Sequence, residues 1–509
     1  MASVSDGDQR AASVTRLLGW GATAAIAFSL LIMVVMLVNG PSVSVPPLTH
    51  PAAGPPWWHG LHLRPSVVLF SLWAAAVIAA AGVAAGLVAV SRGARPPVRP
   101  LLVCVFGVMA IFTVLPPGGS TDTVSYAIDG SMVVAGHSPY VMTPKEFLAT
   151  GAQIARGSPT IWQNSLSDYG PLATATEWSA AELGGTSLAR ITFWLKMWTA
   201  LAFGAVVLLL DWLLRSDPVM RLRAHVLWSA NPLLLWLIVA GGHIDGVAIA
   251  FGLAGVAVLR APRPGTDPGL GRAVLAGLLI GAAIAVKSPY ALFALAAAWA
   301  LRRHLASLAA LAVGGLIALA PAYLVSGRAA VTALVNRGSE VTWDNLYQIC
   351  LRAVGITNPV PAHLVTIATV LCVAVAVLAW LRLPSRVPSL PAVTPALALS
   401  LAWTFMWPFQ RPWYDVMIIA LLVLYPASRL DWVVLIRLCF AGITYMDAIG
   451  LPTASRLYHL QEFEGHWITA TVRLVTAVAL IWLCVSGRWG WRSRSAESAV
   501  AAPELQPLT

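Results

Sequence analysis

Charged residues are scarce in this 509-residue chain, where Asp, Glu, Lys and Arg fill only 10% of the positions and apolar residues fill 58%. A soluble domain usually contains about 25% charged residues, so the composition excludes an ordinary soluble protein. Acidic residues are fewer than basic ones, with 21 Asp and Glu against 32 Lys and Arg. Most of the basic residues are arginines at the ends of apolar runs, where positive charge reports membrane topology, and we therefore predict no nucleic-acid partner.

Cysteine is also rare, and its spacing carries no signal. The five cysteines form no CxxC pair or other metal-ligand pattern, so the sequence gives no basis for a disulfide framework or a zinc site. The chain shows no internal duplication and no sizeable soluble domain. We predict no bound metal and no cofactor.

Long apolar runs separated by Arg, Pro and Gly clusters predict an all-α integral membrane protein. The polytopic domain should span residues 17–486, between cytoplasmic tails at 1–16 and 487–509. About fourteen transmembrane spans are expected, at 17–38, 66–90, 101–115, 188–213, 225–240, 246–260, 273–287, 289–301, 305–325, 362–381, 391–407, 412–428, 430–448 and 467–486.

Arginines in the short loops predict that the N-terminus is cytoplasmic. The alternation of spans then places the polar, aromatic-rich segments together on the extracytoplasmic side. These segments are 116–187, 241–245, 287–290, 326–361 and 407–415. We expect the active site on that face of the plasma membrane.

Two acids, Asp122 and Asp129, lie in the first large outer segment, in the stretch TDTVSYAIDG, with Tyr126 between them. They are seven residues apart, so on a helix both lie on nearly the same face, two turns apart. Ser120 or Thr121 can cap this helix and hold the Asp122 carboxylate in the positive end of its dipole. A lone acid at a membrane edge is more often a cap residue, but this one has neighbours that favour a substrate site.

Those neighbours are tyrosines beside rigid prolines and a His-x-Asp pair. Tyr140 in SPY and Tyr169 in SDYGP can hydrogen-bond to a sugar or stack on its ring. The stretch GGHIDG brings His243 and Asp245 to the same side of the membrane. Two ligands make a weak metal signal, so a helix cap with a sugar-hydroxyl contact is the simpler interpretation.

Two further clusters combine aromatic and polar side chains, in WDNLY at 343–347 and WPFQRPWYD at 407–415. Interfacial aromatic belts explain isolated Trp and Tyr. They explain less well the polar groups beside them, which are typical of a carbohydrate pocket. We therefore predict that substrate contacts Trp343, Asp344, Gln410, Trp413 and Tyr414.

Three cations on the outer side run against the charge bias of the chain. Lys287, Arg337 and Arg411 can extend toward lipid phosphates, or they can bind a phosphate group of the substrate. We rank Arg337 first for phosphate, because the long outer loop can fold over the site.

Six blocks of sequence resemble a known family. They are DTVSYAIDG, GHSPY, YGPL, NPLLLWLIVAGGHIDG, VKSPYALFALA and QRPWYDVMIIALL, in order between residues 115 and 425. In order and placement they resemble the actinobacterial polyprenol-phosphomannose-dependent alpha-1,6-mannosyltransferases, membrane enzymes of the GT-C class.

This resemblance implies a GT-C-like bundle of about 13–14 transmembrane helices with a large first extracytoplasmic catalytic loop. It implies a polyprenyl phosphomannose donor, a lipid-linked glycan acceptor such as lipomannan, and close contact with membrane lipid. It also implies that Asp122 is the catalytic base.

Two alternatives remain open. A transporter or lipid flippase usually carries ionisable or broken-helix features near mid-membrane. Most spans here have clean apolar centres, Lys196 being the main exception, which favours an enzyme. A GT-C enzyme with another sugar or a protein acceptor would have a similar hydroxyl-binding pocket, which sequence cannot tell apart.

Overall fold

The computed structural model describes residues 6–261, 265–337, 340–342, 344–356, 361–383, 387, 389–445, 451 and 453–490. These residues form helices and connecting loops, with one isolated bridge between Ser428 and Gly490 as the β pairing within the described part. The prediction of an all-α, multi-pass membrane protein is confirmed.

The N-terminal half contains α1 (Asp6–Val38), α2 (Pro65–Ser91), α3 (Val98–Val114), α4 (Asp122–Val134), α5 (Pro144–Ala149), η1 (Gln153–Gly157), α6 (Pro171–Gly184), α7 (Leu188–Leu213), α8 (Pro218–Ala224), η2 (His225–Ser229), α9 (Pro232–Leu234), η3 (Leu235–Ala240) and α10 (Asp245–Val258). The rest of the chain contains α11 (Leu270–Val286), η4 (Ser288–Tyr290), α12 (Ala291–Leu301), α13 (Leu305–Arg337), α14 (Leu346–Ala353), α15 (Pro361–Arg382), α16 (Val393–Met406), η5 (Pro412–Asp415), α17 (Val416–Leu422), α18 (Arg429–Thr444), α19 (Arg456–Phe463), η6 (Glu464–Thr469) and α20 (Ala470–Ser486). Helix α1 begins at Asp6, so helix replaces part of the polar tail expected before residue 17.

Six helical segments of the described chain are long and apolar enough to cross a membrane, and a bent pair makes up to seven. The six are Ala12–Val38, Pro65–Ser91, Leu188–Leu213, Leu305–Ala333, Ala362–Arg382 and Arg456–Ser486. Six further apolar helices have 10–17 residues. The fourteen predicted spans fall on helices, but about half of these are shorter than the roughly 20 residues that cross a bilayer unaided.

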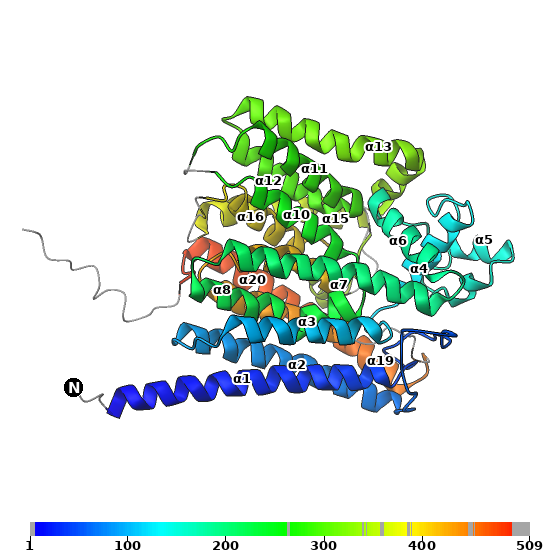
Figure 1. Cartoon of the computed structure of the whole chain (residues 1–509), viewed down its shortest axis with the longest axis horizontal. Helices are drawn as coiled ribbons and strands as arrows, with labels where there is room; N and C mark the ends of the chain where they lie inside the picture. The colour runs from blue at the N-terminus through cyan, green and yellow to red at the C-terminus, as the bar shows by residue number, and fades with distance from the viewer. Residues whose placement is uncertain are drawn as a thin grey trace, which may run out of the picture.

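Close helix packing uses small residues, as is usual where lipid rather than water surrounds the helices. A Cβ atom at Gly277 of α11 would lie 2.1 Å from the Leu311 carbonyl oxygen, and one at Gly314 of α13 would lie 2.1 Å from the Val274 oxygen. Glycine at both positions therefore lets the backbones of α11 and α13 touch. Figure 1 shows these two helices side by side at one edge of the bundle.

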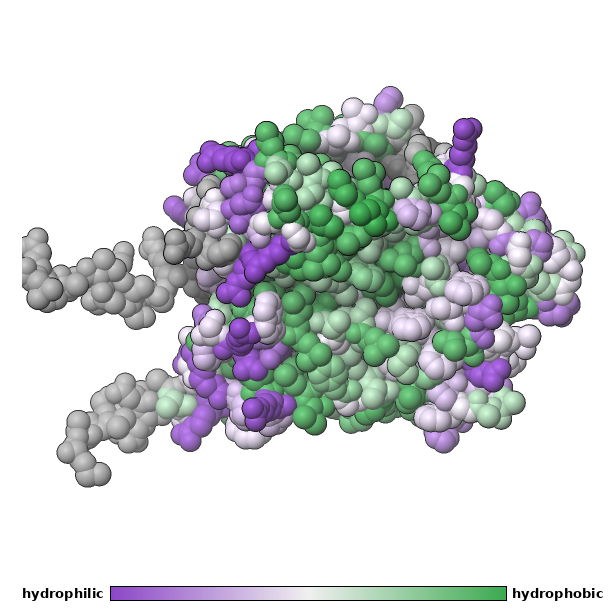
Figure 2. All heavy atoms as spheres, turned by 45° about the horizontal axis from the view of Figure 1, so that its top comes forward, coloured by the Kyte–Doolittle hydropathy of each residue, from purple (hydrophilic) through white to green (hydrophobic). Residues whose placement is uncertain are grey.

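The irregular and short elements gather at one end of the bundle. Figure 1 shows α4, α5 and α6 projecting at the end opposite the start of α1, with α19 and the connection between α1 and α2 nearby. Figure 2 shows a broad apolar band between more polar ends. The segments predicted to share one side of the membrane therefore include those that build this end.

Candidate active site

A pocket opens at this end, where α4, the loop before α6 and the segment 407–415 meet. It is lined by Asp122, Ser125, Tyr126, Asp129, Pro144, Trp162, Ser165, Leu166, Ser167, Asp168, Tyr169, Phe409, Arg411, Trp413 and Tyr414. The empty space, including its opening to solvent, is about 560 Å³.

The two predicted acids reach the pocket from one face of α4. The helix begins at Asp122, whose backbone N–H donates to the Ser120 hydroxyl over 3.1 Å. Asp129, two turns later, lines the same pocket. The Asp122 side chain keeps 15% of its surface exposed, so a substrate hydroxyl can reach its carboxylate.

A bend between the helical segments Pro218–Ser229 and Pro232–Ala240 brings His243 to Asp122. Pro232 lacks an N–H, Asn231 caps the following turn, and the helices on either side meet at 41°. Gly242 then adopts a φ of 65°, which suits glycine, and Thr123 of α4 donates a hydrogen bond to the Gly241 carbonyl. The His243 Nε2 atom consequently lies 3.8 Å from Asp122 Oδ2.

The segment 407–415 supplies the opposite wall. Trp413 stacks on the His243 ring, with centroids 3.7 Å apart and planes 18° apart. Arg411 donates to the Tyr445 hydroxyl and lies over the Phe409 ring, 4.9 Å from its centroid. Arg411 and Asp122 thus line the same pocket, which Asp129 and Asp168 also line.

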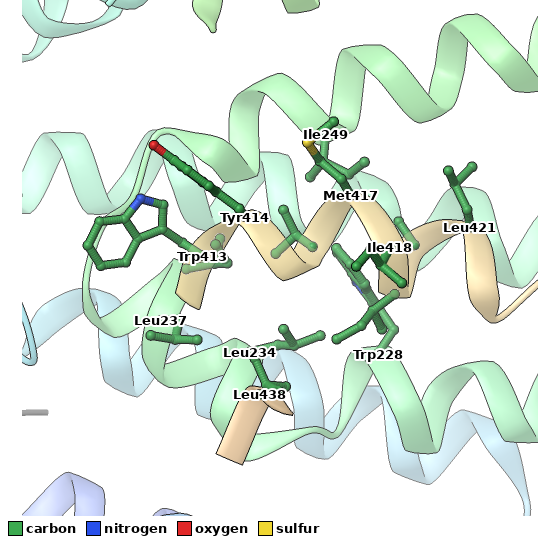
Figure 3. Close-up of a cluster of buried hydrophobic side chains, with 14 of the residues drawn as sticks. Trp228, Leu234, Leu237, Ile249, Trp413, Tyr414, Met417, Ile418, Leu421 and Leu438 are labelled. Atoms are coloured by element: carbon green, nitrogen blue, oxygen red, sulfur yellow. The ribbon is translucent and has the colours of Figure 1, made fainter. Parts of the chain in front are cut away.

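Apolar packing anchors this wall from behind. In Figure 3, Trp413 and Tyr414 lie at one end of a buried cluster that Met417, Ile418 and Leu421 continue along α17. The aromatic side chains are thus held by a core helix, which fixes their direction toward the pocket.

Lys287 lies behind the pocket, paired with an acid. Its Nζ atom contacts Asp245 Oδ2 at 2.7 Å, and it lies 4.3 Å from the centroid of the Tyr414 ring and 5.3 Å from that of Tyr169. The Tyr169 and Tyr126 hydroxyls are hydrogen-bonded at 3.0 Å. The lysine therefore supports the tyrosine wall of the pocket, and its charge is largely matched by Asp245.

Several predicted site residues lie elsewhere. Tyr140 is buried and hydrogen-bonded to the Thr174 hydroxyl at 2.7 Å. Gln410 Nε2 donates to the Phe405 carbonyl over 3.0 Å, and Asp344 pairs with Arg473 at 2.7 Å. None of these three is among the described residues that line the pocket. Trp343 and the side chain of Arg337 lie outside the described part of the chain.

The pocket also contains residues that sequence reasoning did not single out. They are Ser125, Pro144, Trp162, Ser165, Leu166, Ser167, Asp168 and Phe409. Ser125 lies one turn from Asp122 and Asp129 on α4, so the same spacing argument could have found it. Trp162 and Asp168 come from an irregular loop, where periodicity gives no direction for a side chain.

Burial changes the protonation of the acids around Asp129. Burial, together with the negative charge of Asp168, raises the pKa of Asp129 to about 7. Glu177 of α6 is fully buried, and burial followed by the charge of Asp129 raises its pKa well above the ordinary value. Asp129 and Glu177 therefore hold their protons at higher pH than ordinary carboxyl groups do.

The described residues include no group of three or more His, Cys, Asp or Glu side chains placed to hold a metal ion. The groups available to a substrate are instead a carboxylate, a guanidinium, tyrosine hydroxyls and aromatic faces. Such a set can take a proton from a hydroxyl, bind an anionic group and stack on a sugar ring.

The sequence matches the family model described as "Alpha-(1->6)-mannopyranosyltransferase, N-terminal domain" over residues 22–303. The chain belongs to this family. The match includes α4, the His243 turn and Lys287, and it ends before Arg411. The resemblance first noted in the six sequence blocks is thereby confirmed.

Curated relatives are similar over shorter regions. The alpha-(1->6)-mannopyranosyltransferase B of Corynebacterium glutamicum is 29% identical over 175 residues, which are 33% of this chain and 28% of that protein. A probable alpha-(1->6)-mannopyranosyltransferase of Mycolicibacterium smegmatis is 27% identical over 142 residues, 28% of this chain and 25% of that one. An alpha-(1->6)-mannopyranosyltransferase of Mycobacterium tuberculosis is 25% identical over 161 residues, 30% and 27% of the two chains.

These matched regions span less than a third of each relative. No solved structure matches the chain.

Proposed function

We propose that this protein transfers mannose from polyprenyl monophosphomannose to a lipid-linked mannan acceptor, forming an alpha-1,6 linkage on the extracytoplasmic face of the plasma membrane. The observation that carries the proposal is the pocket of a family member in which the Asp122 carboxylate and the Arg411 guanidinium face one cavity beside aromatic rings. A donor that is both phosphorylated and lipid-borne suits a polar pocket at the end of a membrane bundle.

The reaction is a single displacement with inversion. Asp122 takes the proton of the acceptor's primary hydroxyl while that oxygen attacks the anomeric carbon. The bond from this carbon to the phosphate oxygen breaks, and its electron pair leaves with the polyprenyl phosphate. A beta-linked donor thereby gives an alpha-linked product.

Arg411 stabilises the departing phosphate. The leaving oxygen gains negative charge in the transition state, and a guanidinium fixed in a partly desolvated pocket stabilises that charge more than bulk water does. Lys287 is less suited to this role, because its ammonium already pairs with Asp245 at 2.7 Å.

The aromatic wall and the tyrosine hydroxyls hold the sugars. Burial raises the pKa values of Tyr126 and Tyr169 well above the ordinary value, so both hydroxyls remain donors at neutral pH. Trp413 offers a ring face on which a pyranose can stack.

The decisive test measures transfer from radiolabelled polyprenyl phosphomannose to defined mannoside acceptors by the purified protein. Asp122→Asn should lower the rate by roughly 10²–10⁴-fold, because the base is lost while the shape is kept. Asp217→Asn is the matched control, since Asp217 caps α8 and Asn caps a helix equally well.

Other outcomes identify other functions. Transfer from a nucleotide sugar in place of the lipid donor would contradict the proposed donor and side of the membrane. Movement of the lipid across a vesicle membrane without transfer would indicate the transporter alternative. Full activity of Asp122→Asn would remove Asp122 as the base.

A further inference from the structure

The tautomer of His243 is set by its backbone contact. Its Nδ1 atom lies 2.5 Å from the Leu237 carbonyl oxygen, which can only accept a hydrogen bond. Nδ1 therefore carries the proton, and Nε2 holds a lone pair. The ring is 1% exposed and stacks on Trp413, so it is held in this orientation.

The lone pair of Nε2 faces Asp122. Nε2 has no hydrogen-bond partner among the described residues, although it is buried. Asp122 Oδ2, another acceptor, lies 3.8 Å away. Two acceptors at this distance do not attract each other. Once Asp122 carries a proton, a side-chain shift of about 0.8 Å toward Nε2 brings the two atoms within hydrogen-bond distance.

We propose that His243 is a positioning residue for the base, whose Nε2 accepts a hydrogen bond from the Asp122 carboxyl once Asp122 has taken the proton of the acceptor hydroxyl. This role rests on the proposed function. The acceptor O–H bond breaks, its proton binds Asp122, and His243 gains only a hydrogen bond. The hydrogen bond to His243 thus stabilises the protonated form of Asp122, which arises as the new glycosidic bond forms.

Burial keeps His243 neutral, as this role requires. Burial, helped by the positive charges of Lys287 and Arg411 and opposed by Asp122, lowers the pKa of His243 to about 4. Asp245 of α10 is paired with Lys287. At neutral pH the imidazole therefore leaves Nε2 unprotonated and available.

Two substitutions distinguish the roles of Nδ1 and Nε2 of His243. His243→Asn places an amide N–H near Nδ1, which keeps the bond to the Leu237 carbonyl but removes the acceptor toward Asp122. His243→Gln can place its carbonyl oxygen near Nε2 and keep that acceptor. His459→Asn, at an exposed histidine of α19, is the control for the same chemical change.

The measured quantities are kcat and KM for donor and acceptor, together with the thermal unfolding temperature. His243→Asn should lower kcat about 10-fold, the effect of one lost hydrogen bond of about 1.4 kcal/mol, with both KM values within about twofold of wild type. His243→Gln should recover part of this loss. His459→Asn should match wild type.

A double-mutant cycle with Asp122→Asn completes the test. If His243 acts through Asp122, adding His243→Asn to Asp122→Asn should cause little further loss. A further 10-fold loss in that background, a rise in KM alone, or a wild-type kcat in both His243 variants would overturn the role. If His243→Asn does not fold, His243→Gln is measured alone and together with Asp122→Asn: a kcat loss that appears only while Asp122 is present supports the role, and a wild-type kcat or an equal loss in both backgrounds overturns it. Absence of transfer by the wild-type protein would instead refute the proposed function, and this role with it.

Discussion

Replacing Gly130 should displace α4, the helix that carries the proposed base Asp122. An ideal Cβ atom at Gly130 of α4 would lie 2.2 Å from the Glu177 carbonyl oxygen and 2.5 Å from the Glu177 carbonyl carbon of α6. Ordinary contact begins at 3.4 Å. Since both atoms belong to the backbone, no side chain can rotate away, and Gly130→Ala must push α4 and α6 apart by about 1 Å.

This displacement should lower the stability of the fold modestly and the rate of transfer more strongly. Overpacking a tight contact destabilises by about 1–3 kcal/mol, from which the higher helix propensity of Ala subtracts about 1 kcal/mol. Helix α4 carries Asp122, Tyr126 and Asp129, and a misplacement of about 1 Å in a catalytic geometry can cost about 10²-fold in rate. We therefore expect kcat/KM to fall about 100-fold while the protein still folds.

The assay compares Gly130→Ala with Gly107→Ala. Gly107 lies within α3, and a Cβ atom there has no neighbour within 4 Å, so this control changes helix propensity without a clash. Transfer kinetics and thermal unfolding are measured for both purified variants. Near-wild-type kcat/KM in Gly130→Ala would refute the close α4–α6 contact as the element that positions Asp122.

Three further predictions follow from single contacts. Arg411→Gln should raise the donor KM and lower kcat about 10-fold or more, because its contact strengthens as the phosphate leaves; donor kinetics like those of wild type would exclude Arg411 as the phosphate ligand. Lys196→Met should lower the free energy of unfolding by about 3 kcal/mol or more, because the buried Lys196 donates to the carbonyls of Phe112, Leu115 and Pro116. A loss below about 1 kcal/mol in thermal unfolding would contradict this. Asp129, whose pKa rises from 3.8 to about 7, keeps a proton in the folded state that the unfolded state releases, so its contribution to stability should fall between about pH 4 and pH 7, by up to about 1.4 kcal/mol per pH unit. Asp129→Asn should flatten that part of the pH–stability curve, and an unchanged curve would show that another group titrates there.

Local spacing sufficed to predict the helix that carries Asp122 and Asp129. The stretch from Asp122 to Asp129 has no helix breaker, and a separation of seven residues puts both acids on one face. The structure begins α4 at Asp122 and turns both acids into the pocket. The alternation of apolar spans likewise predicts that the 241–245 and 407–415 segments lie on the same side of the membrane as this helix, because each follows an odd number of predicted crossings from an N-terminus expected in the cytoplasm.

The roles of individual polar residues could not be predicted in this way, since they depend on partners far apart in sequence. Lys287 and Arg411 look alike as outer cations, but Lys287 meets Asp245, 42 residues away, whereas Arg411 lines the pocket. Asp344 lies beside aromatic residues in sequence, yet it pairs with Arg473 of α20. A buried arginine needs hydrogen-bond acceptors, and the tertiary structure rather than the local sequence determines which polar residue supplies them.

Buried polar contacts of this kind hold the segment 407–415 in place beside the pocket. Arg437 of α18 donates to Asp415 Oδ1 over 3.1 Å and to Gln410 Oε1 over 3.4 Å, so one guanidinium holds both sides of the turn that carries Arg411 and Trp413. Gln410 and Asp415 therefore fix the wall of the pocket that carries Arg411 and Trp413.

The same wall joins two parts of the chain that the family match separates. Residues 22–303 contain Asp122 and His243, whereas Arg411 and Trp413 lie beyond that match. The stacking of Trp413 on His243, with ring centroids 3.7 Å apart, brings the wall that carries Arg411 against the turn that places His243 beside Asp122. Because the ion pair between Arg437 and Asp415 fixes the turn that carries Trp413, a buried pair in the C-terminal half helps to hold the His243 ring in place.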